Sequence, residues 1–111
     1  MNPQGTKYVS PQATGQRAVA LGKYTTADGD ASMAINYDTH AIGKKSFAIN
    51  SNTTAEGIAS FSSGHVTTAK GYCSSSFGSY NETSGWYSLV GGFHSTIGEN
   101  ANSSIAFGDH V

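Results

Sequence analysis

Small and large side chains alternate along the chain in short runs, and the alternation returns every 14 residues. The run from Gly15 to Gly22 reads GQRAVALG, and related runs follow it in register. A last, partial block (101–111) fits only if Glu99 and Asn100 are counted as inserted. A fixed period of this kind is the signature of a repeat architecture. We number the places of each block from one to fourteen, starting at its first glycine. The blocks begin at Gly15, Gly29, Gly43, Gly57, Gly71 and Gly85.

Each block predicts two short strands separated by two turns. Places four to seven, as in Ala18–Leu21, and places eleven to thirteen, as in Thr25–Ala27, alternate with a period of two, which is typical of strands. Place eight is glycine or asparagine and place one is glycine, and at both we expect the chain to turn with positive φ. So many glycines disfavour helix. The sequence therefore predicts an all-β parallel solenoid of about seven coils, stacked about 4.8 Å apart.

The alternation also predicts where the side chains point. Places four, six, eleven and thirteen are almost all Ala, Ser or Thr, so we expect them to face a narrow interior. Places five and seven then face outward, although most of them are large and apolar. Such a stripe is too large for a soluble monomer and predicts an interface between copies of the chain. Ser63, Ser75 and Gly91 weaken it in the later blocks. The predicted interface residues are Val19, Leu21, Met33, Ile35, Phe47, Ile49, Phe61, Phe77, Leu89, Ile105 and Phe107.

Length and composition limit the remaining possibilities. We expect residues 1–14, with Pro3 and Pro11, to form an extended lead-in or cap that ends in a half coil, and residues 15–111 to form one repeat domain. Only 12% of the residues are charged and the net charge is -1, which argues against nucleic acid as a partner. No window is apolar enough for a membrane span, and the first residues do not resemble a signal peptide.

The polar residues do not form a recognisable catalytic or metal site. His94 and His110 share place ten and could lie close together, but two imidazoles are an incomplete metal site. The carboxylates are scattered, and the serines belong to a structural column, so we expect no enzyme, no metal and no cofactor. Polysaccharide cleavage is the only enzymatic class worth considering. An ice-binding face needs outward threonines, whereas the regular threonine column is predicted to face inward.

Aromatic residues gather at the turn places of the fifth and sixth blocks. Exposed rings beside polar groups are the usual chemistry of sugar recognition. The alternative is that the rings pack between neighbouring coils or subunits, and the sequence leaves both interpretations open. The candidate ligand-binding residues are Tyr72, Tyr80, Trp86, Tyr87, Phe93 and His94.

Several of these runs match a known family. AVALG at 18–22, SFAIN at 46–50 and SIAFG at 104–108 resemble the SVAIG signature of the YadA-like heads of trimeric autotransporter adhesins. TTAKG at 67–71 is similar to related repeats in phage tail-fibre proteins. The resemblance covers residues 15–111. It implies a left-handed parallel β-roll that forms a homotrimer, with places five and seven in the intersubunit core.

The resemblance also implies a function. It points to a non-enzymatic adhesion or receptor-binding fibre module whose partners are its own copies and a cell-surface glycan or protein receptor. Its location would be a virion or the cell surface. The lack of a leader favours a phage tail fibre or tail tip over the head of a secreted bacterial adhesin. A purely structural fibre spacer is a further alternative.

Overall fold

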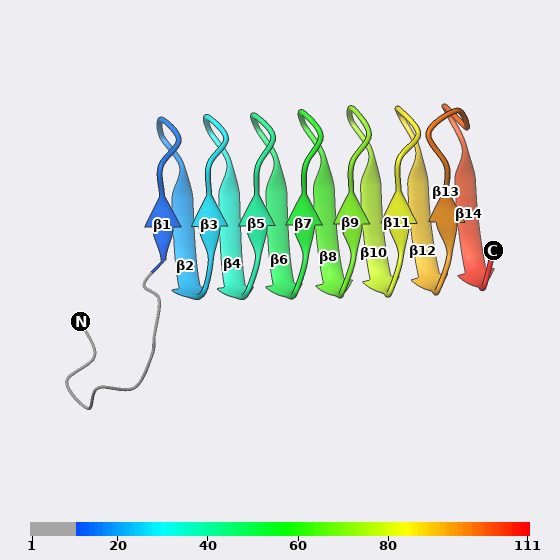
Figure 1. The fold of residues 1–111 in the computed structure, drawn as a ribbon, viewed down its shortest axis with the longest axis horizontal. Helices are drawn as coiled ribbons and strands as arrows, with labels where there is room; N and C mark the ends of the chain where they lie inside the picture. The colour runs from blue at the N-terminus through cyan, green and yellow to red at the C-terminus, as the bar shows by residue number, and fades with distance from the viewer. Residues whose placement is uncertain (1–10) are drawn as a thin grey trace.

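The chain folds as a stack of flattened coils, each made of one long and one short strand (Figure 1). This computed structural model describes residues 11–111, and the expected lead-in at residues 1–10 lies outside them. The long strands are β2 (Val19–Lys23), β4 (Met33–Tyr37), β6 (Phe47–Ser51), β8 (Phe61–His65), β10 (Ser75–Ser79), β12 (Leu89–Phe93) and β14 (Ile105–Asp109). The short strands are β1 (Gln12–Ala13), β3 (Thr26–Ala27), β5 (His40–Ala41), β7 (Thr54–Ala55), β9 (Thr68–Ala69), β11 (Glu82–Thr83) and β13 (Thr96–Ile97).

The strands form two parallel seven-stranded sheets, one of long strands and one of short strands. Within each sheet a strand pairs with its counterpart in the next coil, as in Val19 with Met33 and Thr26 with His40. The predicted parallel solenoid of about seven coils is thus confirmed. The pairing of Leu89 with Ile105 spans two residues more than the others, and the extra residues widen the loop between β13 and β14 (Figure 1). Among residues 11–111 no helix is long and apolar enough to cross a membrane.

The interior is narrow and lined by the small residues that the alternation predicts. Residues at places four, six, eleven and thirteen are buried in every inner coil; in the end coils Ala18, Ala20 and Ser104 are half-buried and Ala13 is exposed. The threonine column, Thr25 to Thr67, is therefore internal, as expected. The last coils replace alanine with larger residues, Val90 and Ile97, which form a second core cluster.

Some buried hydroxyls bond to carbonyl groups of their own coil, and Ser88 and Ser95 donate to carbonyl groups of the next coil, whereas others lack a partner. Ser74 Oγ donates to the Gly71 carbonyl at 2.7 Å, and Thr67 Oγ1 donates to the Ser63 carbonyl at 3.1 Å. Each hydroxyl without a partner occupies the same place as a bonded one in another coil. Those without a partner are Thr25, Ser32, Thr39, Ser46, Ser60 and Ser76.

The turns use positive φ at places three, eight and ten of each coil. Place eight holds glycine, or asparagine at Asn36 and Asn50 with φ of 93° and 94°, as predicted. Places three and ten carry ordinary residues, and even the β-branched Val66 has a φ of 56°. The expectation of positive φ for the place-one glycines is wrong, because none of them has it.

Close stacking of the coils explains the place-one glycines instead. A Cβ atom built on Gly57 would lie 2.1 Å from the Gly71 carbonyl oxygen, and the other place-one glycines show the same clash with the next coil. At this place the backbones of successive coils approach too closely for any side chain.

The predicted interface residues all lie on the outer face of the long-strand sheet, and we call them together the apolar stripe. They are exposed at the two ends of the rod and half-buried in its middle, where rings of neighbouring coils touch, as Phe47 and Phe61 do at 5.5 Å between centroids. The gap that Gly91 makes in the apolar stripe is smaller than the sequence predicts. The rings of Phe77 and Phe107 meet over it, 5.7 Å apart, and bury it.

Candidate ligand-binding grooves

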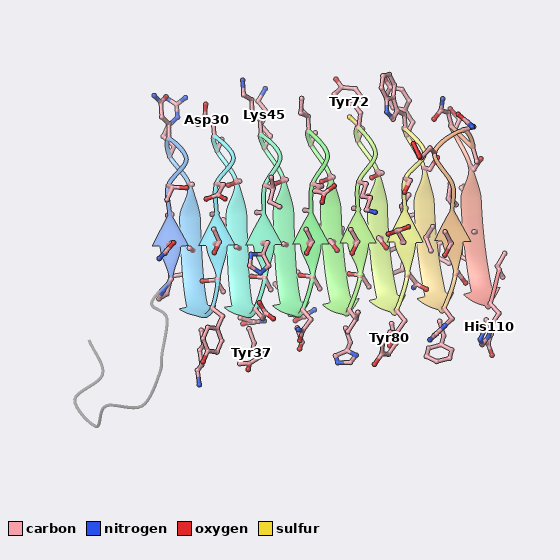
Figure 2. All side chains as sticks on the ribbon, viewed as in Figure 1. Asp30, Tyr37, Lys45, Tyr72, Tyr80 and His110 are labelled. Atoms are coloured by element: carbon pink, nitrogen blue, oxygen red, sulfur yellow. The ribbon has the colours of Figure 1, made fainter. Side chains whose placement is uncertain are left out.

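The structure divides the six candidate ligand-binding residues between two opposite edges of the solenoid (Figure 2). Tyr72, Trp86 and Tyr87 occupy places two and three, in the turns that lead from a short strand to the next long strand. Tyr80, Phe93 and His94 occupy places nine and ten, where a long strand leads into the next short strand. They therefore do not form a single site. We call the two groups the Trp86 edge and the Tyr80 edge.

Rings of the Trp86 edge touch across coils and remain exposed. Tyr72 meets Trp86 at 5.9 Å and Tyr87 at 5.5 Å between ring centroids, both in edge-to-face geometry. Edge-to-face contacts are favourable for aromatic pairs. Trp86 is nevertheless 55% exposed and Tyr87 58% exposed. Packing between coils and availability to a ligand are thus compatible at this edge.

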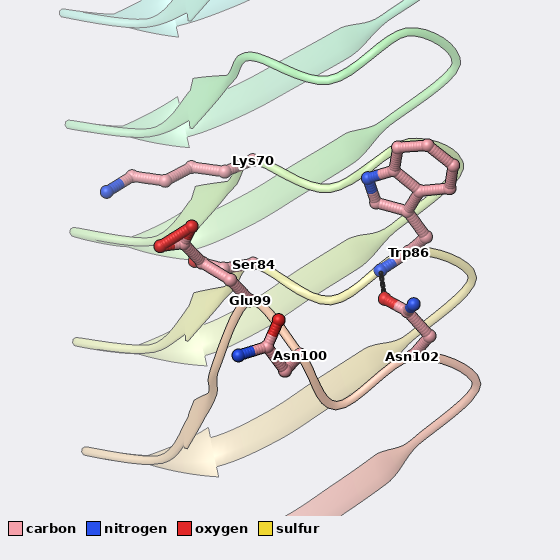
Figure 3. A pocket seen from close by; sticks show the side chains of 6 residues that line it. All are labelled: Lys70, Ser84, Trp86, Glu99, Asn100 and Asn102. Atoms are coloured by element: carbon pink, nitrogen blue, oxygen red, sulfur yellow. Dashed lines mark hydrogen bonds between the residues drawn. The ribbon is translucent and has the colours of Figure 1, made fainter.

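A groove of about 580 Å³ opens beside Trp86 (Figure 3). Its walls come from three successive turns between a short strand and the next long strand, and they include the two inserted residues, Glu99 and Asn100. The Asn102 Oδ1 atom accepts a hydrogen bond from the Trp86 backbone N–H at 2.8 Å, which ties the widened loop to the turn that carries the indole. The lining residues are Lys70, Ser84, Trp86, Glu99, Asn100 and Asn102.

The charged groups in and beside this groove are one lysine and two glutamates, Lys70, Glu99 and Glu82. Lys70 Nζ lies 3.0 Å from Glu82 Oε2, and the hydrogen bond and charge of Glu82 raise the pKa of Lys70 above its ordinary value. Lys70 therefore stays protonated at neutral pH, with its charge partly compensated. The groove offers amide, hydroxyl and carboxylate groups beside an exposed indole, which suits a ligand that has both hydroxyl groups and apolar ring faces.

A second groove, of about 490 Å³, lies on the other side of Trp86 and Lys70. It is bounded by Glu56, Ile58 and Tyr72 and is more apolar than the first. Trp86 and Lys70 line both grooves and form a ridge between them, so an extended ligand could contact both grooves. We refer to the two together as the Trp86 grooves.

The Tyr80 edge is a row of rings that runs along four coils. Tyr80 contacts His65 at 5.4 Å, Phe93 at 6.2 Å and His94 at 5.1 Å between centroids. His94 and His110 stack at 5.1 Å, so the expected proximity of these two residues is confirmed. Within residues 11–111, no three potential metal-ligating side chains gather at one point.

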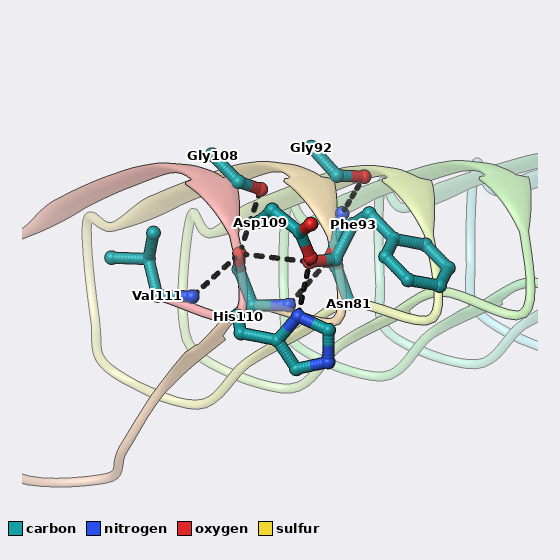
Figure 4. A network of polar contacts seen from close by, with 8 residues as sticks. Asn81, Gly92, Phe93, Gly108, Asp109, His110 and Val111 are labelled. Carbon is teal, nitrogen blue, oxygen red and sulfur yellow. Dashed lines mark hydrogen bonds and ion pairs between the residues drawn. The ribbon is translucent and has the colours of Figure 1, made fainter.

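A polar network fixes the turns beneath this row (Figure 4). The buried Asn81 donates through Nδ2 to the Phe77 carbonyl at 2.6 Å and the Gly92 carbonyl at 2.9 Å. Its Oδ1 atom accepts from the Ser95 N–H at 2.7 Å. His110 Nδ1 bonds to the carboxylate of Asp109. The row therefore has a rigid base, and no groove among the described pockets is lined by it.

The sequence interpretation missed the polar lining of the Trp86 grooves. Lys70 and Asn102 are not among the residues that the sequence predicts for a ligand site, although the insertion of Glu99 and Asn100 is visible in the sequence. An insertion in a regular repeat marks a loop that leaves the common path, and this was the available signal.

Comparison with known proteins does not add a function. No protein-family model matches the chain, and no curated protein sequence matches it.

Proposed function

We propose that the chain is a left-handed, homotrimeric β-roll module of a receptor-binding fibre, of the phage tail-fibre or bacterial-adhesin type, and that its Trp86 grooves bind a cell-surface glycan. The observation that carries glycan binding is the exposed Trp86 indole between two grooves rimmed by amide, hydroxyl and carboxylate groups. Aromatic platforms with a few polar groups are the usual chemistry of saccharide sites.

The apolar stripe supports the trimer. Seven parallel strands carry large apolar residues on one outer face, and Leu21, Ile105 and Phe107 are each more than half exposed. A continuous patch of this kind marks an association surface. The Trp86 grooves do not contain any residue of the stripe, so copies that meet through the stripe keep their grooves open. Three equivalent sites per fibre would strengthen weak individual contacts by avidity.

A glycan array tests the binding proposal. The chain is applied as wild type, as Trp86→Ala and as Tyr80→Ala, which removes an exposed ring from the opposite edge. We expect wild type and Tyr80→Ala to bind the same glycans and Trp86→Ala to lose about tenfold in affinity, since one well-placed aromatic contact contributes about 1.4 kcal/mol.

Two results would contradict this proposal. Equal binding by Trp86→Ala and wild type would show that the Trp86 grooves are not the glycan-binding site. Absence of binding by all three proteins would favour the structural spacer.

A further inference from the structure

The first coils carry another groove, on the opposite edge from Trp86 and far along the rod from it. Its volume is about 510 Å³, within the range of roughly 300–1,000 Å³ that is typical of small-molecule sites. It runs from the turn after β4 onto the outer face of the short strands β3 and β5. Its lining residues are Tyr24, Thr26, Tyr37, Asp38 and His40. The groove lies on the same edge of the solenoid as Tyr80, but none of its lining residues belongs to the Trp86 grooves or to the row of rings around Tyr80.

Two tyrosine rings form one wall of this groove. Tyr24 and Tyr37 meet edge to face, with centroids 5.6 Å apart and an interplanar angle of 88°. Lys23 Nζ lies 5.2 Å from the centroid of the Tyr24 ring and covers that ring in part. Tyr37 is 47% exposed and projects from the edge of the solenoid (Figure 2). It is therefore the ring that a ligand can stack against.

The polar wall is held in place by a chain of hydrogen bonds. Asp38 Oδ1 lies 3.0 Å from His40 Nε2, and Asp38 Oδ2 accepts from Asn52 Nδ2 at 2.9 Å. Asn52 Oδ1 in turn accepts a hydrogen bond from the Ser51 hydroxyl at 3.0 Å. A neighbouring coil thus orients Asp38 and, through it, the His40 ring. Side chains held in this way lose little conformational entropy when a ligand binds.

The free hydrogen-bonding capacity of this wall is mostly that of an acceptor. A carboxylate has about four lone-pair sites, and the contacts with His40 and Asn52 use two of those on Asp38. When Nε2–H of His40 donates to Asp38, Nδ1 is left as an acceptor. The Thr26 hydroxyl, on the neighbouring strand beside His40, can both donate and accept. A ligand must therefore bring donors to this wall.

We infer that the groove of Tyr24, Tyr37, Asp38 and His40 is a second saccharide-binding site, which takes a neutral sugar. Sugar hydroxyls supply the donors that Asp38 and His40 require, and the C–H face of a pyranose ring stacks on Tyr37. An anion such as phosphate or a uronate offers acceptors and is repelled by the Asp38 carboxylate. The inference names the same ligand class as the proposed function but uses separate residues, so each can fail without the other.

The test is NMR titration of the full ¹⁵N-labelled chain with defined probes. The neutral probes are the methyl glycosides of glucose, galactose and mannose, and N-acetylglucosamine; inorganic phosphate and glucuronate are the anionic ones. We expect at least one neutral sugar to shift the amide signals of Tyr37, Asp38 and His40, and neither anion to do so. Tyr37→Ala should weaken this binding about tenfold.

Two variants complete the test. Asp38→Asn keeps the shape and suits the positive φ of 51° at this position, since Asn52 occupies the same place in the next coil with a φ of 57°. This substitution replaces a carboxylate oxygen, which accepts hydrogen bonds, with an amide NH2 group, which donates them. It should therefore also weaken binding of the neutral sugar. Phe93→Ala removes a ring from the same place of a later coil and should leave the titration unchanged.

The outcomes separate this site from the Trp86 grooves. Sugar binding that Trp86→Ala abolishes and Tyr37→Ala does not would overturn the second site and leave the proposed function intact. The second site would also be overturned if the amide signals of Tyr37, Asp38 and His40 responded to none of the neutral sugars. A stronger response of these signals to phosphate or glucuronate would overturn it as well.

Discussion

At the scale of single residues, glycine serves two different purposes in this repeat. At place eight it permits a φ above +100°, as at Gly64 and Gly78, and a Cβ there would also meet the next coil, at 2.1 Å from the Gly78 carbonyl oxygen in the case of Gly64. At place one it has an ordinary φ and makes room for the carbonyl of the next coil. The two places look the same in a sequence, because only the geometry shows that place eight combines a positive φ with close stacking and that place one has close stacking alone. The sequence prediction was therefore right about place eight and wrong about place one.

Replacing a place-one glycine tests this explanation. Gly57→Ala puts a Cβ 2.1 Å from a backbone oxygen that cannot move without displacing a coil. We expect the free energy of unfolding, measured by urea denaturation, to fall by about 1–3 kcal/mol.

Gly98 provides the matched control. It lies in the widened loop, where a Cβ would have no atom within 4 Å, and its φ is not in the positive region. Gly98→Ala should change stability by less than about 0.5 kcal/mol. An equal effect of the two substitutions would mean that backbone entropy, and not coil contact, decides both.

At the scale of elements, the coils are alike in their strands and differ in their turns. Period-two alternation and small side chains were enough to predict which places face inward, because burial depends only on those two properties. The aromatic turn residues are neighbours in the sequence, and this led the prediction to group Trp86 with Tyr80. They belong to the two different turns of a flattened coil, on opposite edges. The polar lining of the Trp86 grooves depends on the path of the inserted loop, which the period does not determine.

At the scale of elements, Asn81 is an exception to the repeat that we expect to stabilise the last coils. It stands where earlier coils have threonine, and its three hydrogen bonds join β10, β12 and the turn after β12. Asn81→Ala would leave the buried Ser95 N–H without this acceptor. We expect a loss of about 1–3 kcal/mol in the free energy of unfolding.

Asn100→Ala serves as the comparison, because Asn100 is exposed in the widened loop. It should be neutral within about 0.5 kcal/mol. If Asn81→Ala proved equally neutral, the network of Figure 4 would not stabilise the last coils.

At the scale of the whole molecule, the two outer faces of the solenoid differ in character. The long-strand sheet presents the apolar stripe, and the short-strand sheet with the residues that directly follow its strands presents threonine and charged residues such as Glu82 and Lys70. The interior contains mostly Ala, Ser and Thr, so its apolar contribution to stability is small. Burial of the stripe against other copies would add the apolar contacts that the interior lacks. The grooves stay at the edges, outside the stripe.

The most direct test of the account is sedimentation equilibrium of the full chain, together with circular dichroism. We expect a single species of three times the 11.5 kDa chain mass. Ile49→Asp, in the middle of the stripe, should dissociate it, whereas Thr54→Asp on the opposite sheet should leave it a trimer. A wild-type chain that remains a folded β-rich monomer across the concentration range would contradict the account.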